Sequence, residues 1–278
     1  MQQYEKPTSA AVSFLFVPGN RPDRFQKALD SGASRVILDL EDSIPDSDKA
    51  QAQTNVTAAL HRGLSAPVFI RINGVGSTWL DADLGAIHDA GTARPGCIAG
   101  VVIPKLESVA AVDRIRSVVR ADLELIGLVE SAVGVRELGE LARSGVSRLG
   151  VGAIDLSVDL GAEVNSPLLQ SVYTDVVIGS RACGIDAPLG SPPLTLDDPA
   201  GIEAEARRLS AMGIGGQLCI HPKQVPPIHR GFAPTQEQIA WARRVQASIG
   251  GAVQVDGQMV DLPVRNRAAR IIELSEAQ

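Results

Sequence analysis

Two carboxylate residues, Glu130 and Asp155, close two apolar runs in the stretch from residue 124 to residue 155. This stretch reads as a buried strand, a helix and a second buried strand, because continuous apolar runs suit strands that are covered on both faces. Side chains at the carboxyl ends of neighbouring parallel strands share one crevice, and carboxylate oxygens suit Mg²⁺ or Mn²⁺. The pair predicts a metal site. The alternative is that Glu130 caps a helix and Asp155 begins a turn.

Charged residues also end the preceding predicted strands. Asp39, Glu41 and Asp42 end the second strand, Arg71 lies near the end of the third, and Lys105 ends the fourth. A barrel interior is normally filled with Val, Ile and Leu, so charges at successive strand ends are hard to explain by packing. A rim of salt bridges is the alternative, and it explains any one of these residues better than it explains all of them.

Arg71 is the candidate for binding an anion, because a guanidinium group can meet a carboxylate through two parallel hydrogen bonds. Beside a divalent metal it suits a 2-keto acid, whose keto and carboxylate oxygens can chelate the metal. This combination predicts Lewis-acid catalysis of carbon–carbon bond formation or cleavage through an enolate. Lys105 offers a second route through a Schiff base, which the neighbouring carboxylates make less favoured.

Other polar residues are weaker candidates. His221 follows the eighth predicted strand and either contacts a ligand or caps the next helix, of which the cap is favoured. Arg21, Arg24 and Lys27 lie where the first strand meets its helix. They fit either the phosphates of a nucleotide-bearing ligand or a solvated basic helix face.

The strands that position these residues alternate with helices along the chain. The helices carry start signals, such as Asp198 before Pro199. Eight strand–helix alternations predict an α/β fold, a (β/α)₈ TIM barrel over residues 1–250, with a C-terminal helical extension over 251–278 as a lid or subunit contact. Strands are expected at residues 13–19, 35–42, 66–74, 96–105, 187–193 and 213–222, with two more inside 124–155.

Composition excludes several classes of protein. The net charge of −6 provides no general basic field for nucleic acid. Cys97, Cys183 and Cys219 are far apart and form no CxxC motif, so neither a disulfide framework nor a zinc site is indicated. The N-terminus lacks the features of a signal peptide, and no apolar run reaches the roughly 18 residues that span a bilayer. A soluble cytoplasmic protein is expected.

Eight segments carry a resemblance to a known family. LFVPGNRPDRF, VILDLEDS, FIRINGVGSTW and VVIPKLES are followed by LIGLVES, VGAIDLSVDLGA, LCIHPKQV and VDGQMVDLP. In this order the chain resembles the HpcH/HpaI aldolase and citrate lyase family over nearly its whole length. It is most similar to the CitE-like branch, which is related to the citrate lyase beta subunit, malyl-CoA lyase and citramalyl-CoA lyase.

The resemblance implies a barrel with a C-terminal extension, assembled as a homotrimer or as a hexamer built from trimers. It implies Mg²⁺ held at Glu130 and Asp155. It also assigns an acid/base role to Asp261, delivered into the site of a neighbouring subunit, and this assignment rests wholly on analogy. The residues expected to bind substrate are Arg71, Glu41, Asp42, Lys105 and Arg21.

The expected reaction is Mg²⁺-dependent cleavage or formation of a malyl-, citramalyl- or citryl-type 3-hydroxyacyl-CoA, with a short acyl-CoA and a 2-keto acid as its other reactants. Two alternatives stay open: a CoA-free 2-keto acid aldolase, and a carrier-protein-dependent citrate lyase beta-type subunit. The chain departs from the family pattern at Ile154, where a Glu commonly precedes the metal-binding Asp, and in segment 187–201. Asp23 also stands where relatives that use CoA often carry Lys.

Overall fold

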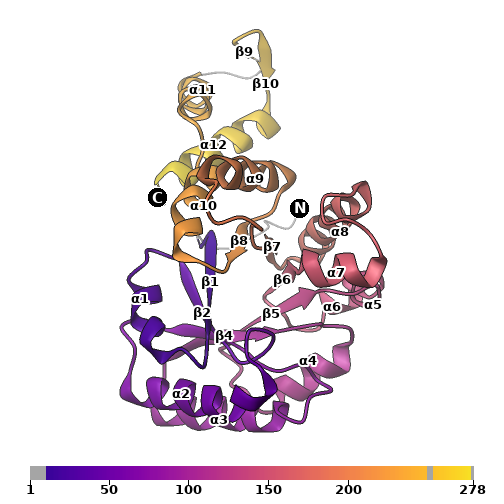
Figure 1. Cartoon of the computed structure of the whole chain (residues 1–278). Coiled ribbons are helices and arrows are strands. Elements are labelled where there is room, and N and C mark those ends of the chain that lie inside the picture. The colour runs from indigo at the N-terminus through magenta and orange to yellow at the C-terminus, as the bar shows by residue number, and fades with distance from the viewer. Residues whose placement is uncertain (1–10, 249–252, 277–278) are drawn as a thin grey trace. The chain divides into compact units, whose positions relative to one another are not determined.

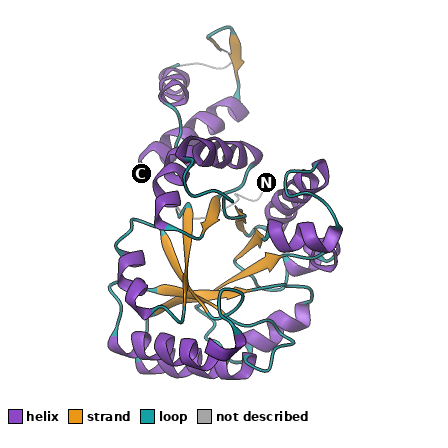
Figure 2. Ribbon diagram, in the orientation of Figure 1, coloured by secondary structure: helices purple, strands orange, loops and turns teal. Residues whose placement is uncertain are grey.

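Eight short parallel strands pair in sequence order and close into a barrel, with β1 hydrogen-bonded to β8 (Figures 1 and 2). The computed structural model describes residues 11–248 and 253–276. The predicted (β/α)₈ barrel is confirmed. Its strands are β1 (Ser13–Pro18), β2 (Arg35–Asp39), β3 (Val68–Arg71), β4 (Ile98–Ile103), β5 (Glu124–Val129), β6 (Arg148–Val151), β7 (Asp186–Gly190) and β8 (Gly216–Cys219).

Most of these strands are shorter than predicted. β2 ends at Asp39 rather than at residue 42, because the Asp39 carboxylate accepts the backbone N–H groups of Glu41 and Ser43 and turns the chain. β6 ends at Val151, so the prediction that Asp155 closes a strand was wrong. Asp155 lies in the first turn of the following helix, α7 (Ala153–Leu160).

The barrel interior is filled by an apolar layer, because alternate residues of each strand point inward. At the N-terminal end of the strands, Arg148 is 3% exposed and pairs with Asp186, Nη2 to Oδ2 at 3.3 Å. Its guanidinium group lies 5.4 Å from the centre of the Phe14 ring. The apolar layer comprises Ala11, Phe14, Ile37, Phe69, Val102, Ile126, Leu128, Leu189 and Leu218.

Helices follow the strands around the barrel (Figure 2). They are α1 (Phe25–Leu29), α2 (Lys49–Arg62), α3 (Leu80–Ala93), α4 (Val109–Arg116), α5 (Ala132–Arg136), α6 (Leu138–Leu141), α7, α8 (Pro167–Cys183), α9 (Pro199–Met212) and α10 (Val225–Phe232), with short 3₁₀ turns η1 (Pro22–Arg24), η2 (Asp46–Asp48) and η3 (Pro222–Gln224). The predicted cap on α9 is confirmed, because the Asp198 carboxylate accepts the Gly201 N–H at 2.9 Å. Among the described residues, no helix combines the length and apolar character that crossing a bilayer requires.

The residues from Phe232 onward form a second compact unit. It contains α11 (Gln236–Ala247), a hairpin of β9 (Val253–Val255) and β10 (Gln258–Val260), and α12 (Leu262–Glu276). The boundary predicted after residue 250 lies outside the described residues. α11 groups with the C-terminal segment because a shared apolar core joins it to β10 and α12, made by Ala242, Val245, Val260 and Ala268.

Packing beneath the strand ends leaves no room for a side chain at Gly100 in β4. A Cβ atom there would lie 2.4 Å from the Glu124 carbonyl oxygen and 2.5 Å from the Phe69 ring. We therefore expect Gly100→Ala to lower the free energy of unfolding by about 1–3 kcal/mol. Gly85 in α3 has no neighbour within 4 Å of a built Cβ. Gly85→Ala should raise the same quantity by about 0.5–1 kcal/mol. Urea unfolding measures both variants, and equal effects would contradict this account.

Candidate active site

The carboxyl ends of β2 and β3 are joined by an ion pair between their last residues, Asp39 and Arg71. Arg71 Nε donates to Asp39 Oδ1 at 2.6 Å, and Nη2 donates to Oδ2 at 2.7 Å. The Asp39 side chain is fully buried and that of Arg71 is 11% exposed. Burial alone would raise the pKa of Asp39, but the hydrogen bonds and charge of Arg71 outweigh it and hold that pKa below its usual value. The pair is therefore ionised at neutral pH.

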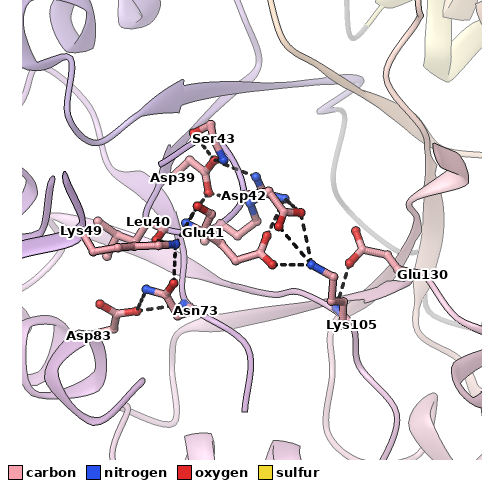
Figure 3. Close-up of polar contacts among 11 residues, drawn as sticks. Asp39, Leu40, Glu41, Asp42, Ser43, Lys49, Asn73, Asp83, Lys105 and Glu130 are labelled. Atoms are coloured by element: carbon pink, nitrogen blue, oxygen red, sulfur yellow. Dashed lines mark hydrogen bonds and ion pairs between the residues drawn. The ribbon is translucent and has the colours of Figure 1, made fainter. Parts of the chain in front are cut away.

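The remaining lone pairs of Asp39 shape the turn that follows β2 (Figure 3). Oδ1 accepts the Glu41 N–H at 2.9 Å, and Oδ2 accepts both the N–H and the hydroxyl of Ser43. One carboxylate thus fixes a guanidinium group on one side and a backbone turn on the other. That turn carries Glu41 and Asp42.

Lys105 lies between these two carboxylates. Its Nζ donates to Glu41 Oε1 at 2.7 Å and to Asp42 Oδ1 at 3.1 Å, while Arg71 Nη1 lies 3.1 Å from Glu41 Oε2. Burial raises the pKa of Glu41. Burial alone would lower the pKa of Lys105, but its hydrogen bonds to Glu41 and Asp42 raise it above the usual value. Lys105 therefore stays protonated at neutral pH and does not supply the free amine that a Schiff base requires.

The backbone of Lys105 reaches the carboxylate at the end of β5. Lys105 has φ = +46°, in the left-handed region that costs a non-glycine residue about 1–2 kcal/mol. In this conformation its N–H donates to Glu130 Oε2 at 2.9 Å. Gly152 faces the other oxygen, because a Cβ atom built on Gly152 would lie 2.4 Å from Glu130 Oε1. Glu130 thus occupies a cradle that a side chain at position 152 would fill.

Glu130 and Asp155 interact electrostatically, although Asp155 is on a helix rather than on a strand. Glu130 is 5% exposed and Asp155 is half-buried. Burial raises the pKa of Glu130 to about 7, and the negative charges of Glu41 and Asp155 add to this effect. The two carboxylates predicted to form a pair therefore share one end of the barrel.

The charges at this end do not balance. Five carboxyl groups meet two cationic side chains, and we call this set of seven residues the strand-end cluster. Within residues 11–248 and 253–276, no three His, Cys, Asp or Glu side chains are arranged to hold a metal ion. A divalent cation held by Glu130 and Asp155 would offset the surplus charge, and Mg²⁺ commonly binds one or two carboxylates while keeping water or substrate oxygens. The donor set therefore fits Mg²⁺. The cluster comprises Asp39, Glu41, Asp42, Arg71, Lys105, Glu130 and Asp155.

Two predicted site residues make contacts elsewhere. Arg21 lies in the loop after β1 and donates from Nε and Nη2 to Asp23, at 3.1 Å in both cases, with both side chains largely exposed. Asp261 belongs to the second unit, where its exposed carboxylate accepts the Val264 N–H at 3.1 Å and caps α12. The binding role of Arg21 and the acid/base role of Asp261 stay predictions.

His221 caps a helix, as favoured, since its Nδ1 accepts the Lys223 N–H at 3.1 Å.

The structure also shows polar residues that the sequence did not point to. Behind the Glu41 turn lie three buried residues that carried no prediction: Lys49, Asn73 and Asp83. Asp83 had a detectable signal, because it falls on the apolar face of α3 together with Leu80, Leu84 and Ile87.

Comparison with known proteins adds three findings. The family model for HpcH/HpaI aldolase/citrate lyase matches residues 12–222. A citrate lyase subunit beta-like protein of Mycobacterium tuberculosis is 36% identical, and the match covers 95% of this chain and 95% of the other. An L-malyl-CoA/beta-methylmalyl-CoA lyase of Cereibacter sphaeroides is 29% identical over 94% of this chain and 93% of its own.

The fold is similar to that of a solved structure as well. The crystal structure of CitE from Mycobacterium tuberculosis, in complex with magnesium, acetoacetate and coenzyme A, superposes with a TM-score of 0.83. The two chains are 31% identical, and the match covers 96% of this chain and 99% of the other.

The raised pKa of Glu130 predicts how stability depends on pH when no metal is bound. Between the ordinary pKa of 4.5 and the folded-state pKa of about 7, the folded chain binds more protons than the unfolded chain. The contribution of Glu130 to stability must therefore fall as pH rises through this window, by at most about 3 kcal/mol. In chelator, Glu130→Gln should be more stable than wild type at pH 8 and similar to it at pH 4.5.

Thermal melting at both pH values measures this difference. A matched control is Glu140→Gln, since Glu140 is exposed on α6 and outside the strand-end cluster. Equal melting temperatures of wild type and Glu130→Gln at pH 8 would show that burial does not raise the pKa of Glu130.

Proposed function

Because this chain belongs to the HpcH/HpaI aldolase/citrate lyase family, we propose that it is a Mg²⁺-dependent carbon–carbon lyase. In this proposal the substrate is a 3-hydroxyacyl-CoA of the malyl, citramalyl or citryl type, and the products are a short acyl-CoA and a 2-keto acid. The observation that carries the proposal is the strand-end cluster, in which Asp39 fixes Arg71 beside Glu41 and a surplus of carboxylates.

Glu130 and Asp155 are the residues that would hold Mg²⁺. Bound Mg²⁺ supplies Lewis-acid stabilisation of negative charge on the keto-acid oxygens. The protein's part is to keep two hard carboxylate donors in place before the ion arrives. The Lys105 N–H fixes one oxygen of Glu130, and Gly152 leaves space for the other.

Arg71 binds and orients the keto acid. Its Nε and one Nη2 hydrogen are directed at Asp39, so the Nη1 side is the part of the guanidinium group that serves the ligand. In the absence of ligand, this side faces Glu41 Oε2 at 3.1 Å. An arginine held by a buried carboxylate is pre-organised, so little conformational entropy is lost when the ligand binds. Lys105 stays protonated and adds positive charge at the rim.

Cleavage and condensation differ in the direction in which Asp261 transfers a proton. In cleavage, a solvent water molecule accepts the proton of the substrate hydroxyl, the bond between C2 and C3 of the acyl chain breaks, and its electron pair passes to the thioester as an enolate. The enolate then takes a proton from the Asp261 carboxyl group to give the acyl-CoA. In condensation, Asp261 removes that proton from the acyl-CoA methyl group.

The relatives support a CoA thioester as substrate. One relative is named as a malyl-CoA lyase, and a structural neighbour was crystallised with magnesium, acetoacetate and coenzyme A. We also propose a cytoplasmic homo-oligomer, a trimer or a hexamer, in which Asp261 serves the barrel of a neighbouring copy. Its exposed position at the start of α12 is compatible with that role.

Release of acetyl-CoA or propionyl-CoA from malyl-, citramalyl- and citryl-CoA tests the proposal. Wild type should cleave at least one thioester with Mg²⁺ and none with chelator. Arg71→Lys should lower kcat/KM by about a hundredfold or more, because a lysine cannot bind Asp39 and the keto acid with the same fork. Asp261→Ala should abolish turnover and leave Mg²⁺ binding unchanged.

Two outcomes would replace the proposal. Metal-dependent aldol cleavage of free 2-keto acids, with no turnover of any thioester, would identify a CoA-free aldolase. Inactivity in both assays, together with co-purification of an acyl carrier protein, would identify a carrier-dependent citrate lyase beta-type subunit. A citrate lyase subunit beta of Leuconostoc mesenteroides is 29% identical to this chain.

Sharing of Asp261 between copies predicts complementation. Asp261→Ala and Glu130→Gln should each be inactive alone. Co-expressed, they should form mixed oligomers in which some sites combine an intact barrel with an intact Asp261, and part of the activity should return. Light scattering gives the mass of the assembly. A monomer, or mixed oligomers without activity, would place Asp261 in its own barrel or remove it from the reaction.

A further inference from the structure

We propose that Lys49, Asn73 and Asp83 are positioning residues of this lyase: they hold the turn that carries Glu41 so that Glu41 and Arg71 are correctly placed for the 2-keto acid. The inference rests on the proposed function and extends it to a buried chain of side chains that lies behind the strand-end cluster. We call these three residues the buried chain (Figure 3).

Lys49, the first residue of α2, binds the backbone of the turn directly. Its Nζ donates to the carbonyl oxygens of Leu40 and Glu41, both at 2.8 Å, and to Asn73 Oδ1 at 2.6 Å. An ammonium group has three hydrogens, so all of its donors are used. Lys49 is 8% exposed. The side chain therefore acts as an internal brace on two successive carbonyl groups.

Asn73 connects Lys49 to a buried carboxylate on α3. Its Nδ2 and its backbone N–H both donate to Asp83 Oδ2, at 2.7 Å and 2.9 Å, and Gln53 Nε2 donates to Asp83 Oδ1 at 3.1 Å. Lysine only donates and an ionised aspartate only accepts, so the chemistry of the neighbours fixes which way the Asn73 amide points. Asp83 is 1% exposed.

The buried chain joins the two segments that carry the anion-binding residues. Asn73 follows Arg71 by two positions, and the Leu40 N–H donates to the Arg71 carbonyl oxygen at 2.9 Å. Lys49 then ties Asn73 to the carbonyl oxygens of Leu40 and Glu41. Two sets of contacts therefore fix the spacing between the Glu41 carboxylate and the Arg71 guanidinium: those of Asp39, and those of the buried chain.

Stability alone does not explain this arrangement. Burying an ammonium group and a carboxylate costs desolvation free energy, and apolar side chains of similar volume often stabilise a fold as well or better. An apolar pair could not hydrogen-bond the Leu40 and Glu41 carbonyl oxygens. The buried chain supplies these hydrogen bonds at the turn whose side chain, Glu41, contacts both Arg71 and Lys105.

The inference predicts a separation between two binding steps. The contacts of the buried chain are with the turn after β2 and the end of β3, whereas Glu130 and Asp155 follow β5 and β6. Substitutions in the buried chain should therefore weaken binding of the keto acid without weakening binding of Mg²⁺. A merely structural role would affect both steps alike or neither.

Isothermal titration calorimetry with Mg²⁺ alone, then with pyruvate at saturating Mg²⁺, tests this. Lys49→Met should raise the Kd of pyruvate by about tenfold or more, since it removes three hydrogen bonds from a charged donor. Asp83→Asn keeps an acceptor for Asn73 but loses the charge, and should raise that Kd by about threefold. Both should leave the Kd of Mg²⁺ within about twofold of wild type.

The matched control is Asp89→Asn, which makes the same change at an exposed position on α3 and should alter neither constant. Thermal melting shows whether Lys49→Met folds. If it does not, two other proteins test the inference: the single variant Asp83→Asn, and the double variant in which Asn73→Asp and Asp83→Asn exchange the two side chains. The exchange keeps an acceptor for Lys49 and restores the amide-to-carboxylate contact, which Asn73→Asp alone replaces by two facing carboxylates. It should therefore recover pyruvate affinity that Asn73→Asp alone loses.

Two results overturn the inference and leave the proposed function intact. Folded Lys49→Met or Asp83→Asn protein with wild-type affinity for pyruvate would leave the buried chain a structural role only. An equal loss of affinity for Mg²⁺ and pyruvate would indicate general loosening. A wild-type protein that binds none of pyruvate, glyoxylate and oxaloacetate in the presence of Mg²⁺ would instead overturn the proposed function, and this inference with it.

Discussion

The site depends on the paired hydrogen bonds between Asp39 and Arg71, because they keep both groups ionised and fix the direction of the Arg71 guanidinium group. A carboxylate at 0% exposure is stable only with strong partners, and here it has a guanidinium fork, two backbone N–H groups and a hydroxyl. The same contacts keep Arg71 ionised although its side chain is largely buried. The Arg71 side chain is thus held in place before any ligand arrives.

The second constraint is an excess of negative charge. Glu130 is buried near Asp155 and Glu41, which is why its proton is bound more tightly than that of an ordinary glutamate. A folded chain accepts such a destabilising group where it has a use, and in the proposed function a divalent cation would take the place of the proton. The strained backbone of Lys105 and the absent side chain of Gly152 both serve to hold this one carboxylate.

Two kinds of support surround the strand-end cluster. The apolar layer of the barrel closes it from below, so the charges of its buried members, such as Asp39 and Arg71, act in a medium of low dielectric constant and interact strongly. The buried chain of Lys49, Asn73 and Asp83 supports it from the side, through backbone carbonyl groups rather than through the side chains of the cluster. Rigid support of both kinds is what a site needs if small displacements reduce its rate steeply.

The sequence by itself determined the barrel, the helix cap at Asp198 and the charged residues at the ends of β2, β3 and β5, because hydrophobic period, capping chemistry and burial cost are local properties of the chain. It did not determine partners. Arg71 was expected to present its fork to a ligand, yet Asp39 holds that fork, and Asp155 stands on a helix. Which of several charges pairs with which, and how Lys49 reaches Asn73, depends on distances of a few ångströms between separate strands. Only the closing of the barrel sets those distances.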